Sequence, residues 1–371
     1  MSNTTLFTPL TIGRHELAHR VVMAPLTRVR ATMPGNLANA MMAEYYGQRA
    51  SRGGLLIAEA SPISQDAIGI PGAPGIWTGE QVRAWQPVTQ AVHAAGGVFF
   101  QQLWHMGRLS HPSHQPGGGL PIAPSAVAAR VEVSTADHQR VPAPVPRAID
   151  TGEIPELIER YVQAARHSID AGFDGVEIHS ANGYLLEQFL QSRTNRRTDA
   201  YGGSIANRCR LVIEITQALV DAIGAQRVAI RLSPFGIAND SGEDEPLPLY
   251  TALIEQLNEL KLAYLHLIEP RASGAGQKEV DHEGLPSAAQ LFRPLWSGVL
   301  ITAGNFKADT AAEMIADGDA DAIAFGRYFI SNPDLPERIR QGAPFTPYNR
   351  STFYSKGPEG YTDYARLTAG A

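Results

Sequence analysis

Hydrogen-bond donors and aromatic side chains follow the short apolar runs of this sequence, and lysine is absent from these positions. The run that ends near residue 179 is followed by an imidazole, an amide and a phenol, those of His179, Asn182 and Tyr184. The other residues of this kind are Thr27, Gln102, Trp104, Arg231, Asn305 and Arg327. Such donors suit an electron-rich ligand: a flavin ring, a phosphate, or a carbonyl oxygen that gains negative charge during a reaction.

The same residues argue against several other kinds of enzyme. A Schiff-base aldolase needs a lysine in its site, and no apolar run ends at one of the four lysines, Lys261, Lys278, Lys307 and Lys356. A retaining glycosidase needs two facing carboxylates, and only Glu59 and Glu269 could serve. The histidines form no His-x-His pair and Cys209 is the one cysteine. We therefore expect no metal centre, no intrachain disulfide bond and no iron–sulfur cluster.

Eight short apolar runs alternate with amphipathic stretches along the chain. We expect strands over residues 20–25, 55–60, 98–103, 175–179, 228–232, 264–268, 299–303 and 322–325. We expect helices over residues 38–52, 80–95, 154–171, 205–223, 249–260, 288–295 and 307–316. Nearly continuous apolar strands are typical of parallel sheets buried on both faces, so the pattern predicts a (β/α)8 TIM barrel. The main alternative is a doubly wound sheet, which usually carries a glycine-rich phosphate turn after its first strand; the sequence contains no complete G-x-G-x-x-G.

Two segments depart from this rhythm. Residues 109–151 are rich in Pro, Gly, Ser and His, and we interpret them as a long insertion after the third strand, over the barrel mouth, with a short hairpin at 128–133. The tail from residue 345 to 371 is rich in aromatic residues and is expected to pack on the barrel: Tyr348, Phe353, Tyr354, Tyr361 and Tyr364. We predict one domain over residues 1–371.

Glycines and polar residues follow the last two predicted strands directly. Gly304 and Asn305 come after the seventh strand, and Gly326 and Arg327 come after the eighth. TIM barrels commonly bind phosphate at these two loops, where glycine lets backbone N–H groups approach the ligand and an arginine adds a forked cation. The sequence therefore predicts one phosphate site here.

Composition narrows the class of protein further. The 371 residues carry a net charge of −6, so no basic surface for nucleic acid is indicated. No stretch is long and apolar enough to span a membrane, and residues 1–13 do not have the pattern of a signal peptide. We expect a cytoplasmic protein that binds neither nucleic acid nor membrane, either a monomer or a homodimer.

Several motifs make the sequence similar to the Old Yellow Enzyme family of flavin-dependent ene-reductases. They are HRVVMAPLTRVRA at 19–31, EYYGQRAS at 44–51, QLWHMGRLSH at 102–111, GFDGVEIHSANGYLLEQFL at 172–190, RTDAYGGSIANR at 197–208, IRLSPFG at 230–236, AFGRYFISNPDL at 324–335 and EGYTDY at 359–364. They lie in order along nearly the whole chain. The branch that the sequence resembles most includes the bacterial pentaerythritol tetranitrate, N-ethylmaleimide and xenobiotic reductases.

The resemblance implies a cofactor, a reaction and a set of roles. It implies non-covalent FMN in a TIM barrel, with NADPH or NADH as reductant and electrophilic alkenes, quinones or nitro compounds as substrates. It places Pro25 and Ala60 beside the FMN ring, and Thr27 at the C4 carbonyl. It places Gln102 at the pyrimidine edge and Arg231 near N1 and O2. The residues that it places at the phosphate are Gly304, Asn305, Gly326 and Arg327. Toward the substrate it places His179 and Asn182 on the activating oxygen, Tyr184 as proton donor, and Trp104, Ile70 and Tyr354 in the pocket wall.

Two positions depart from the pattern of similar bacterial enzymes. Ile70 stands where a tyrosine is frequent, and Asn182 stands where many members have a second histidine. The alternatives that stay open are a reductase acting mainly on nitro compounds, nitrate esters or quinones at the same site, and a barrel that has lost catalysis and only binds a ligand.

Overall fold

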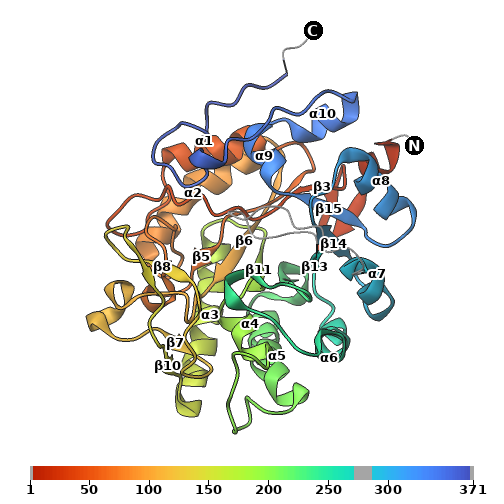
Figure 1. Ribbon diagram of the computed structural model, residues 1–371. Helices are drawn as coiled ribbons and strands as arrows, with labels where there is room; N and C mark the ends of the chain where they lie inside the picture. The colour runs from red at the N-terminus through yellow and green to blue at the C-terminus, as the bar shows by residue number, and fades with distance from the viewer. Residues whose placement is uncertain (1–2, 271–285, 368–371) are drawn as a thin grey trace.

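A closed ring of eight parallel strands forms the centre of the computed structural model, which describes residues 3–270 and 286–367 (Figure 1). The strands are β3 (Val21–Met23), β4 (Leu55–Ile57), β6 (Val98–Trp104), β11 (Gly175–Ser180), β12 (Val228–Leu232), β13 (Tyr264–Ile268), β14 (Leu300–Ala303) and β15 (Ala322–Phe325). They pair in this order, and β15 pairs with β3 to close the ring. The predicted TIM barrel is confirmed, and the ring leaves no free sheet edge.

The barrel strands are short and buried. All residues of β6 and β11 are buried, as expected for strands with a packed interior on one face and helices on the other. Strand β4 ends at Ile57, earlier than the predicted end at residue 60, and the backbone N–H of Glu59 donates to the hydroxyl of Tyr46 at 2.9 Å and not to a neighbouring strand. The Glu59 carboxylate accepts hydrogen bonds from the backbone N–H groups of Arg28 and Val29, at 2.9 and 3.1 Å.

The helices lie around the ring. They are α1 (Ala40–Arg49), α2 (Gly79–Ala94), α3 (Ile154–Asp170), α4 (Leu185–Leu190), α5 (Ile205–Ile223), α6 (Pro246–Glu259), α7 (Ala288–Phe292), α8 (Ala308–Ala316), α9 (Arg327–Ser331) and α10 (Leu335–Gln341). The seven predicted helices are present. Helix α6 starts at Pro246, three residues before the predicted start, because proline is favourable in a first helical turn. The short helices α4, α9 and α10 were not predicted, since their lengths hold too little periodicity.

The segment after β6 contains a hairpin, but not at the predicted position. Residues 128–133 were expected to form it, whereas β8 (Glu132–Ser134) pairs with β9 (Arg140–Pro142) in antiparallel register. The turn lies over residues 135–139, where His138 has a positive φ of 65° and Thr135 bonds the side chain of Asp137. Polar residues that close such a turn with their own side chains decided the position of the hairpin.

Besides the β8–β9 hairpin, two small strand pairs of the described residues lie outside the ring. Strands β1 (Leu10–Ile12) and β2 (His15–Leu17) form an antiparallel pair, and β7 (Ile122–Ala123) pairs in parallel with β10 (Arg147–Ala148). The two-residue strand β5 (Ser61–Pro62) extends the pairing along β6. The β7–β10 pair joins residues 122–123 to residues 147–148, and the β8–β9 hairpin lies between these two strands in the sequence.

The C-terminal tail packs on the barrel, as predicted, and crosses α1 and α9 in Figure 1. Two buried arginines from the loop after β3 hold it. Arg28 donates to the carbonyl oxygens of Phe353 and Gly360, at 3.0 and 2.7 Å. Arg30 donates to the carbonyls of residues 352, 353, 357 and 359, and its guanidinium lies 4.4 Å from the ring centroid of Tyr361. The tail is thereby tied to the loop that carries Thr27.

Replacing Arg30 with methionine should lower the free energy of unfolding by roughly 3 kcal/mol, because several tail carbonyls lose their donors inside the protein. The change is measured as a shift of the denaturant midpoint. Arg166, on the exposed side of α3, supplies the control: Arg166→Met should change the stability by less than about 0.5 kcal/mol. Equal midpoints for Arg30→Met and the wild type would show that Arg30 does not hold the tail.

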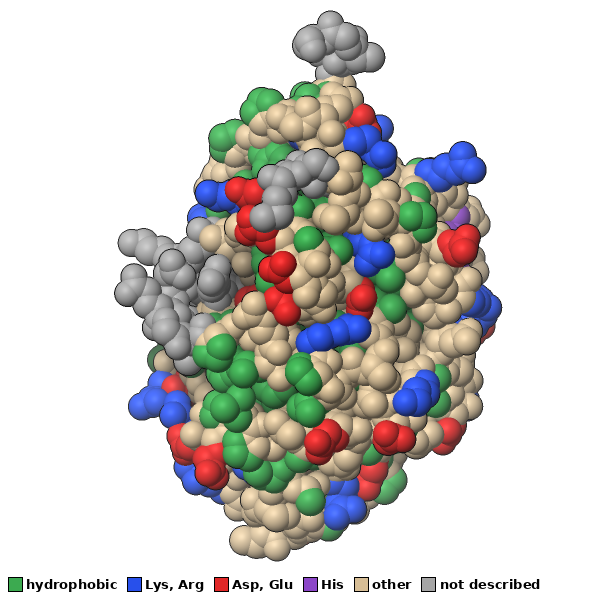
Figure 2. All heavy atoms as spheres, turned by 90° about the vertical axis from the view of Figure 1, so that its right-hand side faces the viewer, with side chains coloured by type: hydrophobic (Ala, Val, Ile, Leu, Met, Phe, Trp, Pro, Cys, Tyr) green, Lys and Arg blue, Asp and Glu red, His purple; other side chains and the backbone are tan. Residues whose placement is uncertain are grey.

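The surface seen in Figure 2 carries acidic and basic side chains interspersed with one another, and the described residues on this face form no continuous basic area. Among the described residues, no helix combines the length and the apolar character needed to cross a membrane.

Candidate active site

A cavity of about 640 Å³ opens at the carboxyl ends of the barrel strands, the end of a TIM barrel where active sites lie. All but one of the predicted site residues line it: Pro25, Thr27, Ile70, Gln102, Trp104, His179, Asn182, Tyr184, Arg231, Gly304, Asn305, Gly326, Arg327 and Tyr354. Ala60 is not among the lining residues. It is buried in an apolar cluster with Trp104 and Met106, which both line the cavity.

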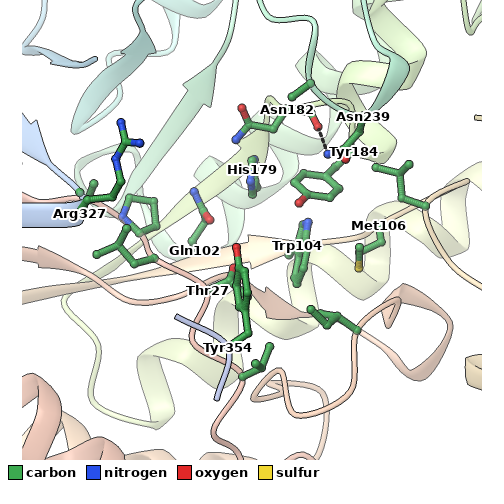
Figure 3. A pocket seen from close by; sticks show the side chains of 18 of the residues that line it. Thr27, Gln102, Trp104, Met106, His179, Asn182, Tyr184, Asn239, Arg327 and Tyr354 are labelled. Carbon is green, nitrogen blue, oxygen red and sulfur yellow. Dashed lines mark hydrogen bonds between the residues drawn. The ribbon is translucent and has the colours of Figure 1, made fainter. Parts of the chain in front are cut away.

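Three of these side chains form a compact group (Figure 3). The ring of Tyr184 lies edge-on to both Trp104 and His179, with centroid distances of 4.9 Å in each case. Trp104 and His179 are nearly parallel to each other at 6.5 Å. Packing of this kind restricts the rotation of each ring, so the phenol of Tyr184 is held beside the imidazole of His179.

The loop after β11 needs support because its backbone is unusual. Asn182 and Gly183 have positive φ angles of 58° and 79°, which glycine tolerates and asparagine tolerates better than most residues. A Cβ on Gly183 would lie 2.8 Å from the carbonyl oxygen of Ala238, so glycine is also required there for space. This loop directs the amide of Asn182 into the cavity next to His179.

A buried carboxylate beneath the loop supplies that support. Glu187 accepts hydrogen bonds from the N–H of Gly183 at 2.5 Å, from Ser233 Oγ at 2.5 Å and from the hydroxyl of Tyr250 at 3.0 Å. Ser233 Oγ in turn accepts from the N–H of Asn182 at 2.9 Å. Sequence reasoning missed Glu187, although its place three residues after Tyr184 in an otherwise apolar stretch was the available signal.

The surroundings decide which site groups carry a proton. Burial, followed by the charge of Arg231, holds the pKa of His179 well below its usual value, so the imidazole is neutral at pH 7. Burial raises the pKa of the Tyr184 hydroxyl above its usual value, so this group stays protonated. The pair is therefore a neutral hydrogen-bonding group beside a proton-bearing phenol over the physiological pH range.

The part of the cavity lined by Thr27, Gln102 and Arg231, the flavin part, suits a flavin ring. Arg231 stands beside His179 in the strand register and is half-buried. Its Nε is a buried atom that finds no hydrogen-bond partner among the described residues. An unpaired buried donor of this charge calls for an acceptor from a ligand. Thr27 and Gln102 line the same part of the cavity. A hydroxyl, an amide and a guanidinium match the carbonyl oxygens and ring nitrogens of a flavin.

Gly304, Asn305, Gly326 and Arg327 lie at the carboxyl ends of β14 and β15, as predicted. Gly304 has a packing role in addition, since a Cβ there would lie 2.4 Å from Cβ of Glu269. The carboxylate of Glu269 is itself occupied: it accepts from the N–H groups of Ala288 and Ala289 at the start of α7, at 2.7 and 3.1 Å. Glu269 and Glu59 are thus engaged structurally, and neither lines the cavity.

Several lining residues were not predicted. Met106 and Asn239 flank Tyr184, and Asn239 donates to the carbonyl oxygen of Asn182 at 2.9 Å. The hairpin contributes Val133 and Arg140, and the tail contributes Lys356. Residues that enter the cavity from segments outside the βα repeat carry no local signal of their destination. The sequence predicted that none of the four lysines is placed in the site, whereas Lys356 lines the cavity because the tail brings it there. Lys278 lies outside the described residues.

The family model for NADH:flavin oxidoreductases and NADH oxidases matches residues 5–345. The chain belongs to this family. A rice (Oryza sativa subsp. japonica) protein named putative 12-oxophytodienoate reductase 4 is 47% identical over 98% of this chain and 93% of its own. Among solved structures, the old yellow enzyme homologue from Zymomonas mobilis has a TM-score of 0.92 and 43% identity, covering 98% of this chain and 99% of that one. Morphinone reductase in complex with tetrahydroNAD has a TM-score of 0.91 and 45% identity, covering 98% of both chains.

Membership of the NADH:flavin oxidoreductase family confirms the resemblance to the Old Yellow Enzymes. The protein is a flavin-dependent oxidoreductase with FMN as cofactor and a nicotinamide nucleotide as reductant. Arg231, with its unpartnered Nε, and the cavity residues Thr27 and Gln102 fit this cofactor. Which substrate the family's site accepts in this chain depends on residues around the cavity.

Proposed function

We propose that this protein reduces activated alkenes, such as enones and maleimides. One observation supports this proposal most strongly. The ring centroid of Tyr184, a protonated phenol, lies 4.9 Å from that of His179, and the amide of Asn182 lies beside them in the same cavity. A carbonyl oxygen that gains charge needs fixed donors, and the carbon next to it needs a proton. Both requirements are met within residues 179–184.

The residues of the flavin part of the cavity would hold FMN as follows. Thr27, Gln102 and Arg231 would bind the ring, and Pro25 and Ala60 would lie beside it. Gly304, Asn305, Gly326 and Arg327 would bind the phosphate. Bound FMN, after reduction by NADPH or NADH, supplies the hydride. A single domain, residues 1–371, would carry this FMN site, and residues 109–151 would form an insertion over the barrel mouth.

The chain's own residues supply the rest of the reaction. His179 and Asn182 would donate hydrogen bonds to the activating oxygen of the substrate, which favours addition of hydride at the β-carbon. Tyr184 would give its proton to the α-carbon. Trp104, Ile70 and Tyr354 would form the wall around the alkene, and an aliphatic Ile70 leaves that wall without a hydroxyl at its position.

The proposal is tested with the purified protein, FMN and a panel of acceptors. The protein should be yellow, NADPH or NADH should bleach it under anaerobic conditions, and 2-cyclohexenone should restore the colour with formation of cyclohexanone. A nitrate ester and a quinone complete the panel. Restoration of the colour by these two acceptors alone would contradict alkene reduction and favour the nitro, nitrate ester and quinone alternative. A yellow protein that no nicotinamide nucleotide bleaches would point to a barrel that only binds its ligand.

A further inference from the structure

Four neighbouring barrel strands bring four polar side chains together beneath the flavin part of the cavity. In the strand register Gln102 of β6 stands beside Glu177 of β11. His179, two residues after Glu177, stands beside Arg231 of β12, which stands beside His266 of β13. Glu177 and His266 are fully buried. Glu177 lies in the motif at residues 172–190, in which roles were predicted for His179, Asn182 and Tyr184 but none for this carboxylate.

The carboxylate of Glu177 orients the side-chain amide of Gln102. Nε2 of Gln102 lies 2.7 Å from Oε1 of Glu177. An ionised carboxylate only accepts hydrogen bonds, so the amide must direct its NH2 group to Glu177. The oxygen of the Gln102 amide is then the atom left to bind a ring N–H in the cavity. Rotation of the amide by 180° would place two acceptors together and is therefore unfavourable.

His266 holds the other carboxylate oxygen, with Nδ1 at 2.8 Å from Oε2 of Glu177. Burial alone would raise the pKa of Glu177, but His266 and Arg231 together with Gln102 keep it below its usual value. Burial outweighs the carboxylate and lowers the pKa of His266. Nε2 of His266 finds no partner among the described residues, which suits an imidazole that carries its one proton on Nδ1. The four side chains beneath the flavin part of the cavity thus carry one negative charge, on Glu177, and one positive charge, on Arg231.

We propose that Glu177 is a positioning residue of the flavin site, which orients the Gln102 amide and partly offsets the charge of Arg231. The inference rests on the proposed placement of FMN against Gln102 and Arg231. The ring of reduced FMN carries negative charge on its pyrimidine side, whereas the ring of oxidised FMN is neutral. A carboxylate beneath that side therefore disfavours the reduced form and lowers the reduction potential, and Arg231 acts in the opposite direction.

Glu177→Gln removes the charge and keeps the shape, so the holoenzyme should be easier to reduce. We expect the ratio of the dissociation constant of reduced FMN to that of oxidised FMN to fall about tenfold. For a two-electron couple this equals a potential about 30 mV higher than that of the wild type. The potential is measured by anaerobic titration against a reference dye. An unchanged or lower potential in the FMN-loaded variant would overturn the electrostatic part of the inference.

Glu177→Asp separates positioning from charge, because it keeps the carboxylate but shortens its reach to Gln102. Oxidised FMN should bind this variant about tenfold more weakly, and in a Gln102→Ala background the same substitution should cause no further loss. Equal losses in both backgrounds would overturn the orienting role.

Glu243→Gln is the matched control for the measurement of the potential, since Glu243 is a buried carboxylate paired with Arg208 at 2.7 Å among the outer helices. The reduction potential of FMN in the Glu243→Gln variant should equal that in the wild type. Failure of the wild type to bind FMN would instead contradict the proposed function.

Discussion

Tyr184→Phe should slow the reduction of 2-cyclohexenone by about 10²–10⁴-fold, the size of a general-acid contribution, while the reduction of bound FMN by NADPH or NADH keeps nearly its normal rate. The substitution removes only the hydroxyl. The ring contacts with Trp104 and His179 at 4.9 Å do not depend on that hydroxyl, so the packing should survive. The reaction with the nicotinamide nucleotide needs no proton from this phenol, whereas protonation of the α-carbon does.

Stopped-flow measurement of the two half-reactions tests this prediction. Tyr201→Phe serves as a control, because it removes a hydroxyl that bonds Glu214 at 2.9 Å outside the cavity, and both half-reactions should keep their rates. Quinones should be affected less than alkenes by Tyr184→Phe, since their oxygens can take protons from water. Equal slowing of both half-reactions would mean that Tyr184 shapes the cavity and that another group supplies the proton. A larger alkene defect in Tyr354→Phe would identify the tail phenol as that group.

Asn182→Gly should slow alkene reduction by about 10²–10³-fold, the usual cost of removing one donor from an oxyanion-type site. Glycine is the appropriate replacement because residue 182 has a φ of 58°, which glycine adopts without strain. The backbone groups of residue 182 bond Ser233 and Asn239, and these bonds remain available in the variant. The rate of FMN reduction and the rate of alkene reduction are measured separately, as for Tyr184.

Asn182→His is the matched control, because it restores a donor at the same position. It should recover most of the lost rate at neutral pH. Neither His179 nor Tyr184 should change its protonation state between about pH 6 and pH 8, since the pKa of His179 lies well below its usual value of about 6.5 and that of Tyr184 lies above its usual value of about 10. Burial raises the pKa of Glu187, beneath the loop, to about 7, so Glu187 is the group expected to cause a pH dependence of alkene reduction by the wild type in this range. A full rate in Asn182→Gly would show that His179 alone binds the activating oxygen.

Local patterns in the sequence were sufficient for the βα repeat and for the chemistry at the strand ends. The eight barrel strands were recognisable because most of their residues are apolar, and parallel strands in a barrel are buried on both faces. His179 lies at the end of such a strand and Asn182 and Tyr184 follow it, so their common destination could be inferred from the rule that strand ends meet at one end of a barrel. The hairpin was misplaced because side-chain hydrogen bonds around Thr135, and not the apolar pattern, decide where its turn lies.

The sequence by itself therefore determined the barrel, the family and a set of site residues of which all but Ala60 line the cavity. The tertiary structure alone decided which charges balance one another there. Glu177 and His266 are 89 positions apart, and they meet only because β11, β12 and β13 stand side by side in the closed ring. Lys356 and Tyr354 reach the cavity only because buried arginines bind the carbonyl groups of the tail. Contacts between distant segments depend on strand register and on backbone groups that every residue possesses, so no residue type or spacing in the sequence marks them in advance.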